Sequence, residues 1–578
     1  MSSNLIALQN RFLGHGDTIY DVIARHMEAH GAITDTDIDA MALAHNLPKV
    51  HVRSVVKFYD EWRAHDREKG PTIKVCIGEA CQAAGGEKCR KWLEGSGPEG
   101  LEVAEVACLG YCGSGPNVMV GDEVRSVPSE TEARRMCSAT AEGLGLPGQE
   151  PVNAYHATKL CPQIVTARFA KKAVSLKEAK NAGVYEALNR VLKTMSPTNV
   201  IDLIKESQIR GRGGAGFPAG VKLATAAGVD AERRYVVCNA DEGDAGAYID
   251  KEIMERDPHN LLEGLLLAAY AIGADTTYIY VRHEYPRSTS VLTEAVNEAR
   301  EAGLIGHHIL GSTFSCEVRV VRGQGAYICG EETSLLRSLE GLPAQVSIKP
   351  PFPAVQGLFG MPTVVNNVET LANFPWIITH GGSAYAALGH AKSRGTKVVS
   401  VNSLVKRPGL YEVPLGITLR TILFDLCGGM KDGSQFRAVQ VGGPLGGIFP
   451  ESLLDTPLDF EAFGAAKGLL GHAGIVVFDD QTDLIRIGRN LMKFCAVESC
   501  GKCFPCRLGS VRGTELLDKV LEGRGVRSDM TLLAELCETL KYGSLCALGG
   551  AIPTPIENLM EYFPEEFDKL IPKEKVKA

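Results

Sequence analysis

Cysteine placement is the sequence feature that most constrains this chain. It has 17 cysteines, and eight of them form two groups of four, one near each end. The opening segment MSSNLIALQNRFLGHGD lacks the basic stretch, the apolar core and the cleavage site of a secretory signal. We therefore expect a cytoplasmic protein, in which grouped thiols serve metal or redox chemistry rather than disulfides.

The N-terminal group consists of two close pairs. Cys76 and Cys81 lie in VCIGEACQAAGG, and Cys108 and Cys112 lie in ACLGYCGSGPNV; each pair follows a β run and enters a loop. A [2Fe-2S] cluster suits this pattern, because each pair of thiolates holds one iron. The spacings, with four and three intervening residues, do not match the CxxC motif of a thiol oxidoreductase. The pattern predicts a [2Fe-2S] site.

The C-terminal group begins with three evenly spaced cysteines. Cys500, Cys503 and Cys506 occur at every third residue in ESCGKCFPCRLGS, and Cys546 in YGSLCALGG is the natural fourth ligand. A [4Fe-4S] cluster takes four cysteines, and one of them often comes from far along the chain. A zinc site made of the same cysteines remains the competing interpretation, although two overlapping C-x2-C pairs with one distant cysteine favour the cluster.

The remaining nine cysteines are scattered, and we expect each to be a small buried apolar residue: Cys89, Cys137, Cys161, Cys238, Cys316, Cys329, Cys427, Cys495 and Cys537. The net charge of −8 gives no support for nucleic-acid binding. The apolar run from Leu261 to Ala274 is interrupted by Glu263 and is too short to cross a bilayer. We therefore expect no direct membrane insertion.

The length of 578 residues predicts several domains. Helical and strand patterns alternate along the chain, which predicts an α/β multidomain fold. The predicted order is a helical bundle (1–68), a compact α/β module with the first cysteine group (69–142), a Gly/Pro-rich linker (143–164), a helix-flanked sheet domain (165–395), a small β domain (396–481) and a helical region with the second cysteine group (482–578).

A glycine-rich loop opens the sheet domain. IRGRGGAGFPAGVK contains Gly211, Gly213 and Gly216 in a literal G-x-G-x-x-G. The Rossmann fingerprint requires a strand immediately before these glycines, whereas the preceding NVIDLIKESQI has helical spacing. We therefore expect a loop that binds a nucleotide in another way, with Arg212 and Lys222 supplying positive charge for a phosphate.

Two further segments carry grouped polar residues. GAYICGEETSLLRSLEG contains Glu331 and Glu332, and KPPFPAVQGLFGMPTVVNNVET contains Asn366 and Asn367. Alone, such carboxylates are usually solvated and such amides usually form turns. Together with the glycine-rich loop they offer donors and acceptors for ribityl hydroxyls, a flavin ring edge and a carboxamide.

These motifs resemble a known family. GRGGAGFP, CNADEG, GAYICGEET, VVNNVET and ESCGKCFPC with SLCALGG are similar to the flavin-carrying subunit of respiratory NADH dehydrogenase and to its relatives in NAD-reducing hydrogenases and NAD-dependent formate dehydrogenases. Residues 1–140, through VVKFYDEW and both cysteine pairs, resemble the small partner of that subunit, with a helical bundle and a thioredoxin-like [2Fe-2S] domain. The chain thus resembles a fusion of two subunits.

The resemblance implies FMN and NAD(H) sites, a non-classical nucleotide-binding fold for 165–395 and a ubiquitin-like fold for 396–481. The residues it implies for FMN are Gly211, Arg212, Gly213, Lys222, Asn239, Asp241, Glu242, Tyr327, Gly330, Glu331, Asn366, Asn367 and Thr370. Those implied for NAD(H) are Gly214, Phe217, Glu332, Lys349 and Phe352. Asp244 stands where many respiratory members carry glutamate, so the NAD(H) contacts there differ in reach.

The expected activity is hydride exchange between NAD(H) and FMN, followed by one-electron transfer through the clusters to a partner. We expect no catalytic acid or base, and the [2Fe-2S] cluster is either a relay or a side reservoir. The expected partner is an iron–sulfur-rich catalytic subunit of molybdenum or tungsten formate dehydrogenase type or of nickel–iron hydrogenase type, in a hetero-oligomer or a dimer of heteromers. The alternatives are an electron-bifurcating hydrogenase, a respiratory NADH:quinone oxidoreductase and a non-enzymatic iron–sulfur scaffold.

Overall fold

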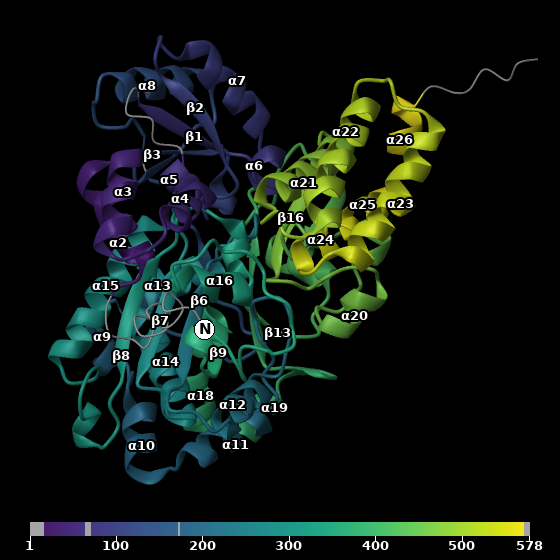
Figure 1. Ribbon diagram of the computed structural model, residues 1–578. Helices are drawn as coiled ribbons and strands as arrows, with labels where there is room; N and C mark the ends of the chain where they lie inside the picture. The colour runs from purple at the N-terminus through teal and green to yellow at the C-terminus, as the bar shows by residue number, and fades with distance from the viewer. Residues whose placement is uncertain (1–16, 64–70, 149, 172–173, 572–578) are drawn as a thin grey trace, which may run out of the picture.

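The computed structural model describes residues 17–63, 71–148, 150–171 and 174–571. The predicted boundary at 68/69 lies outside the described residues, as do the first 16 residues of the predicted helical bundle. Three larger sheets organise the described chain, one in each of three regions that succeed one another from purple to green in Figure 1. The yellow C-terminal helices stand beside them.

The N-terminal helices pack against the central sheet rather than around a core of their own. Tyr20, Val55 and Trp62 share one buried apolar cluster with Tyr278 and Tyr280 of that sheet. Thr34 begins one helix with a reciprocal cap, since its N–H donates to the Asp37 carboxylate and its hydroxyl accepts from the Asp37 N–H. The helices are α2 (Ile19–His30), α3 (Asp35–Ala44), α4 (Lys49–Phe58) and α5 (Asp60–Arg63).

The next region is a four-stranded sheet with the order β2-β1-β3-β4. Strands β1 and β2 are parallel, so their carboxyl ends lie at the same edge; Cys76 ends β1, and Cys108 follows β2. The strands are β1 (Thr72–Cys76), β2 (Glu102–Val106), β3 (Asn117–Val120) and β4 (Glu123–Ser126). The helices are α6 (Glu79–Ala83), α7 (Gly86–Ser96) and α8 (Glu130–Ala141).

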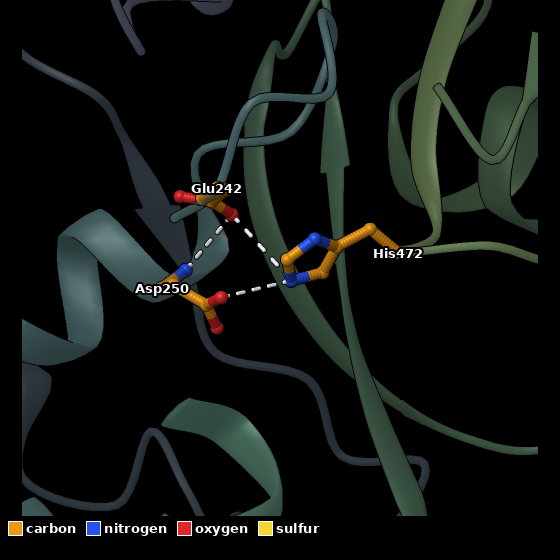
Figure 2. A group of neighbouring side chains, drawn as sticks. All are labelled: Glu242, Asp250 and His472. Carbon is orange, nitrogen blue, oxygen red and sulfur yellow. Dashed lines mark hydrogen bonds and ion pairs between the residues drawn. The ribbon is translucent and has the colours of Figure 1, made fainter. Parts of the chain in front are cut away.

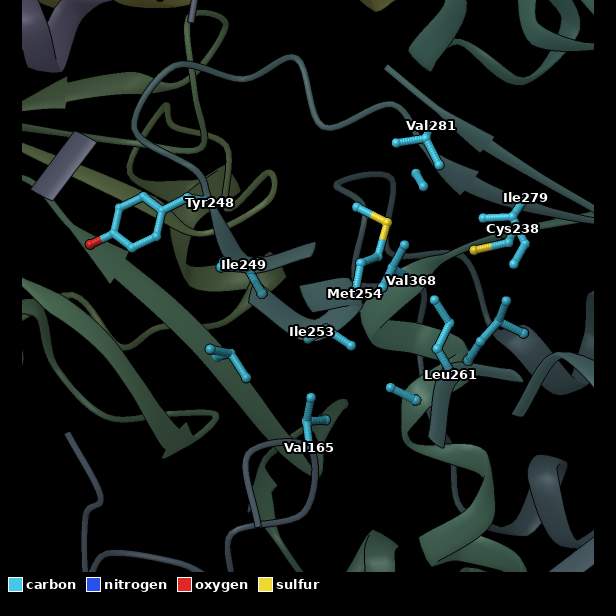
Figure 3. Packing of buried hydrophobic residues seen from close by; sticks show 14 of the residues in the cluster. Val165, Cys238, Tyr248, Ile249, Ile253, Met254, Leu261, Ile279, Val281 and Val368 are labelled. Atoms are coloured by element: carbon cyan, nitrogen blue, oxygen red, sulfur yellow. The ribbon is translucent and has the colours of Figure 1, made fainter. Parts of the chain in front are cut away.

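The central sheet is fully parallel, with the order β8-β7-β6-β9. Its strands are apolar runs because parallel sheets are covered on both faces. Figure 3 shows the packing on one side, where Ile253, Met254 and Leu261 lie near Cys238 and Ile279. The strands are β6 (Tyr235–Ala240), β7 (Thr276–Val281), β8 (Glu317–Arg322) and β9 (Thr363–Asn367).

Helices surround this sheet (Figure 1). They are α9 (Leu176–Asn181), α10 (Glu186–Thr194), α11 (Pro197–Glu206), α12 (Ala219–Gly228), α13 (Ile249–Arg256), α14 (Pro258–Ile272), α15 (Pro286–Glu301), α16 (Glu332–Leu339), α17 (Val368–Ala372), α18 (Phe374–His380) and α19 (Gly382–Ala386).

The third sheet contains a strand from the predicted linker. Its order is β15-β14-β16-β12-β13-β5, and Tyr155 and His156 of β5 pair in parallel with Leu410 and Tyr411. The Gly/Pro-rich composition of 143–164 indicated only a connection. The elements are β5 (Tyr155–His156), β12 (Thr396–Val401), β13 (Gly409–Pro414), β14 (Phe436–Val441), β15 (Gly447–Phe449), β16 (Gly474–Asp479) and α20 (Phe460–Ala465), with the hairpin β10 (Gly389–His390) and β11 (Ser393–Arg394) beside them.

The C-terminal region is helical, and α21 packs along α22 and against α25. Nowhere in the described ranges does a helix combine the length and the apolar character that a bilayer crossing needs. The helices are α21 (Leu484–Glu498), α22 (Ser510–Leu521), α23 (Arg527–Gly543), α24 (Ala547–Ala551), α25 (Pro553–Tyr562) and α26 (Pro564–Leu570).

Candidate functional site

The four N-terminal cysteines converge. Cys76, Cys81, Cys108 and Cys112 are all at most 2% exposed. The Sγ atoms of Cys108 and Cys112 lie 3.6 Å apart, and the Cys76 thiol is within hydrogen-bonding reach of those of Cys81 and Cys108. Four buried thiols at one point form the donor set of a [2Fe-2S] cluster.

The central region touches this donor set directly. The Gly246 N–H, in the loop between β6 and α13, donates to Cys112 Sγ at 3.3 Å. A Cβ at Gly110 would lie 2.6 Å from the Tyr285 ring, so the loop between Cys108 and Cys112 sits against the start of α15 without room for a side chain. The first cysteine group therefore lies at an interface with the central region.

The C-terminal cysteines also converge. Cys500 and Cys503 follow α21, Cys506 lies in a π-helical turn, and Cys546 comes immediately before α24. The Cys546 thiol interacts electrostatically with those of Cys500 and Cys506, and Cys503 and Cys506 are within hydrogen-bonding reach of each other. The structure thus brings together the four thiols that the spacing predicted as [4Fe-4S] ligands.

A fifth cysteine borders this group. Cys495 on α21 is fully buried, as predicted, but its Sγ lies 4.0 Å from Cys506 Sγ and its thiol donates to the Leu548 carbonyl at 3.5 Å. Its position five residues before Cys500 carries no ligand spacing, so no sequence pattern placed it here. Of the other scattered cysteines, Cys161 is partly exposed, so the prediction of burial was wrong there, and the rest are buried, as predicted.

The glycine-rich loop lies between two helices, α11 and α12, which removes the Rossmann interpretation as predicted. The Gly211 N–H donates to the Phe217 carbonyl at 2.9 Å and closes the loop on itself. The Arg212 N–H donates to Thr370 Oγ1 at 2.8 Å. A Cβ at Gly213 would lie 2.9 Å from the Asn367 Cβ, so only glycine lets the loop come this close to β9.

The predicted cofactor residues gather at the carboxyl ends of β6 and β9. Asn239 at the end of β6 donates through Nδ2 to the Gly330 carbonyl at 2.8 Å. The Tyr327 hydroxyl donates to Asp244 Oδ1 at 2.7 Å. In open parallel sheets, ligands bind outside the carboxyl ends of the strands, so this is the expected edge for a nucleotide.

We call the site formed by the glycine-rich loop and the carboxyl ends of β6 and β9 the cradle. Two lysines and two glutamates form one side of it. Lys349 Nζ lies 2.9 Å from Glu331 Oε1 and 3.1 Å from Glu332 Oε1, and Lys222 Nζ lies 3.6 Å from Glu332 Oε2. Burial lowers the pKa of Lys222, although Glu332 opposes the shift. The two predicted aromatic contacts, Phe217 and Phe352, are 51% and 57% exposed and so remain accessible to a planar ring.

Several buried donors in the cradle lack acceptors. Arg212 is fully buried; its Nη2 donates to the Tyr385 hydroxyl at 2.9 Å and to the Arg394 carbonyl at 2.6 Å. Its Nε and Nη1 have no hydrogen-bond partner among the described residues, and neither do Nδ2 of Asn366 and Nε of Arg394. Unpaired buried donors are costly, so these residues fit a bound group that carries anionic and carbonyl oxygens, as FMN does.

Burial raises the pKa of three acids beside the cradle. Desolvation raises the pKa of Asp241 well above its usual range, and it also raises the pKa of Asp244. Burial also raises the pKa of Glu242, to about 7, although its carboxylate accepts the N–H groups of Ile249, Asp250 and Lys251 at 2.7, 3.0 and 3.0 Å, which oppose the shift. It therefore caps α13 from outside the helix.

A histidine from the third sheet region joins this cradle (Figure 2). His472 Nε2 lies 3.0 Å from Asp250 Oδ2 and 3.8 Å from Glu242 Oε1. Burial alone lowers the pKa of His472, but the pairing with Asp250 and Glu242 outweighs it and raises the pKa to about 9. The sequence did not single out His472, Asp250, Tyr385 or Arg394; only the fold brings these residues to the loop.

Comparisons with known proteins agree with this geometry. Residues 204–376 match the Nuo51 FMN-binding domain, 486–570 the NADH-ubiquinone oxidoreductase-F iron-sulfur binding region, and 9–140 the thioredoxin-like [2Fe-2S] ferredoxin. The chain is 44% identical over 394 residues to the HndC subunit of the NADP-reducing hydrogenase of Solidesulfovibrio fructosivorans, a match that spans 68% of this chain and 80% of that one. This chain belongs to the family of NADH dehydrogenase flavin subunits.

Other members of the family are also similar. The F subunit of the NADH-quinone oxidoreductase of Escherichia coli (strain K12) is 42% identical over 403 residues, covering 69% of this chain and 91% of that one. A chain of the NAD+-reducing [NiFe]-hydrogenase in its H2-reduced state superposes with a TM-score of 0.83 at 27% identity, covering 97% of this chain and 95% of that chain.

Membership of this family confirms the predicted multidomain α/β fold, with its thioredoxin-like [2Fe-2S], FMN-binding and C-terminal [4Fe-4S] regions. It also confirms the predicted activity: the chain is a flavin iron–sulfur oxidoreductase subunit that acts on NAD(H) through FMN, a [2Fe-2S] cluster and a [4Fe-4S] cluster.

Proposed function

We propose that the residues around the glycine-rich loop hold FMN and NAD(H) in defined roles. The unpaired guanidinium edge of Arg212 supports a contact with the FMN phosphate, and the unpaired amide of Asn366 supports a contact with a flavin or ribityl oxygen. Thr370 and Asn367 hold the loop that carries Arg212 and Gly213. When bound, FMN supplies the chemistry that accepts a hydride as two electrons and releases electrons one at a time.

The NAD(H) side of the cradle is the edge with the exposed aromatic rings. Phe217 and Phe352 offer planar faces to the adenine. Glu332 and Lys349, already paired with each other, offer an acceptor and a donor to the polar groups of the dinucleotide. We assign no proton transfer to a side chain, because hydride transfer to a flavin needs none from the protein.

The experiment that tests these roles uses the purified full chain. We expect acid treatment to release FMN at about one per chain, and NADH to reduce ferricyanide and to bleach the flavin absorbance. Absence of flavin after reconstitution with FMN would contradict the cradle. Flavin that NADH does not bleach would contradict the NAD(H) edge alone.

The chain is a subunit of a larger complex in our proposal. Its relatives include subunits of NADH-quinone oxidoreductase and of hydrogenases, and the superposed hydrogenase chain spans nearly the whole of this one. This coverage favours a nickel–iron hydrogenase type of catalytic partner within a hetero-oligomer. Metal analysis of the co-purified large subunit tests it: nickel supports the proposal, whereas molybdenum or tungsten indicates a formate dehydrogenase type.

Apolar side chains around the second cysteine group support the position of this partner. Phe504 and Leu508 are 73% and 56% exposed beside Cys503 and Cys506, and Tyr542 and Leu545 are 79% and 44% exposed before Cys546. Exposed apolar residues grouped in this way mark protein interaction sites. We propose that the catalytic partner docks over these four residues, next to the [4Fe-4S] ligands.

A further inference from the structure

His472 is a buried side chain beside the cradle that the roles above leave unassigned. It lies between Gly471 and β16 of the third sheet region, and Gly471 forms an isolated antiparallel bridge with Gly214 of the glycine-rich loop. Its ring points toward the start of α13, where Glu242 and Asp250 face it (Figure 2). A residue from one region therefore reaches the cofactor cradle of another.

The contacts of His472 involve two residues of the predicted FMN set. Asn367 Nδ2 donates to Asp250 Oδ2 at 2.6 Å and lies 3.4 Å from His472 Nε2. Glu242 lies 3.8 Å from the same ring nitrogen. Because His472, Asp250 and Glu242 are at most 5% exposed, solvent screens these interactions weakly. Loss of the ring would leave two buried carboxylates close together and Asn367 less firmly held.

The charged groups around the His472 ring come from three different parts of the fold. Asp250 lies on α13, Glu242 and Asp244 lie in the loop after β6, and the neutral Asn367 ends β9. Lys397 on β12 also acts on the ring, but it is itself paired with Glu369. A protonated imidazole thus pairs with the carboxylates of Asp250 and Glu242, and the Asp244 carboxylate also acts on it.

We propose that His472 is a positioning residue of the FMN site, which fixes Glu242 and, through Asp250, Asn367 in the cradle and whose positive charge favours the reduced flavin. With FMN bound, hydride transfer from NADH would bring the flavin two electrons, one proton and one negative charge. A neighbouring cation stabilises that charge, whereas unbalanced carboxylates oppose it. The inference rests on the proposed FMN cradle and adds a residue from the third sheet region to it.

The test is a spectroelectrochemical titration of the bound flavin in the full chain, with His472→Gln compared to wild type. At pH 8 we expect His472→Gln to lower the ratio of reduced to oxidised flavin at a fixed potential about tenfold, equivalent to about 30 mV for a two-electron couple. His472→Lys, which keeps a cation, should restore much of the ratio. His259→Gln is the matched control, because His259 is buried between Tyr185 and Glu298 outside the cradle.

The pH dependence separates charge from packing. His472 loses its proton near pH 9, so the wild-type and His472→Gln titrations should converge above that pH. Equal ratios at pH 8, or a difference that persists unchanged above pH 9, would overturn the inference while leaving the FMN cradle intact. Wild-type protein that binds no FMN would instead overturn the cradle. If His472→Gln fails to fold, the wild-type titration decides alone, since a potential without a change of slope near pH 9 contradicts the proposal.

Discussion

At the scale of single residues, a buried guanidinium with unused donors needs an acceptor. The Nη2 of Arg212 donates to the Tyr385 hydroxyl and the Arg394 carbonyl, whereas Nε and Nη1 have no partner among the described residues. The arrangement fits the proposed phosphate contact, because a guanidinium, unlike an ammonium group, can bond protein oxygens and phosphate oxygens at the same time.

Substitution of Arg212 tests this division of donors. We expect Arg212→Lys to weaken FMN binding about 100-fold, because losing charge-assisted hydrogen bonds costs about 3 kcal/mol. Fluorescence titration of the flavin-depleted chain with FMN measures the affinity. Arg234→Lys is the control, since the Arg234 guanidinium also makes two hydrogen bonds, to the Ala226 and Val229 carbonyls, but lies away from the cradle. An unchanged affinity in Arg212→Lys would place the phosphate elsewhere.

The two neighbouring cysteines Cys546 and Cys495 allow an equally direct test. Cys546→Ala should abolish the electron paramagnetic resonance signal of the [4Fe-4S] cluster and leave that of the [2Fe-2S] cluster, because the cluster loses one of four ligands. Cys495→Ala, which removes a sulfur only 4.0 Å from Cys506, should keep both signals. The reverse result would exchange the roles of the two cysteines.

At the scale of elements, a buried acid that joins α14 to α10 makes the stability of the fold depend on pH. Glu263 is 2% exposed, and its Oε1 accepts the Leu188 N–H at 2.9 Å at the start of α10. Burial raises its pKa to about 7. Because the folded pKa exceeds the unfolded value of about 4.5, the folded state favours the protonated acid, and stability is lost as pH rises from about 4.5 to about 7.

Glu263→Gln should remove this dependence. The amide keeps a carbonyl for the Leu188 N–H and carries no charge, so we expect the variant to be more stable than wild type by about 3 kcal/mol at pH 8 and equally stable near pH 4.5. Chemical denaturation of both proteins across this range measures the difference. Parallel pH profiles would show that Glu263 ionises freely in the folded chain.

Local patterns predicted these elements well where one segment carried the whole signal. The helical spacing of NVIDLIKESQI became α11, and the apolar runs around Val236, Ile279 and Val320 became adjacent parallel strands. The strand β5 escaped prediction because two residues carry no periodicity, and its pairing with β13 depends on a segment some 250 positions away. The role of Glu263 could not be predicted for the same reason. It interrupts an apolar run in α14, but its carboxylate accepts a hydrogen bond from the Leu188 N–H of a different helix, α10.

At the scale of the whole molecule, the ligand spacings were visible in the sequence but their surroundings were not. Cysteine groups and glycine-rich loops are local patterns that carry their own chemistry. By contrast, three residues reach the cradle from segments at least 170 positions after Arg212: Tyr385, Arg394 and His472. No local sequence pattern around them indicates this role. The residue roles proposed for FMN and NAD(H) remain predictions that the variants above test.

The proposed docking surface gives a prediction for the assembled complex. We expect the double variant Phe504→Glu, Leu508→Glu to lose the catalytic partner in affinity purification, because two charges would be buried in an apolar contact. Ferricyanide reduction by NADH in the isolated chain should remain within about twofold of wild type. Val50→Glu, at a residue 74% exposed on α4, is the matched control. Retention of the partner by the double variant would move the interface elsewhere.

The pairing of β5 with β13 has a consequence for the stoichiometry of the two cluster-bearing halves. After the first cysteine region, the chain adds strand β5 to the third sheet and then enters the central region. The Gly246 N–H and the Cys112 Sγ that it contacts therefore belong to one polypeptide. Tethering gives the two halves an effective concentration that dilution does not lower. The [2Fe-2S] module therefore stays at one copy per flavin at any protein concentration, whereas two separate chains would dissociate.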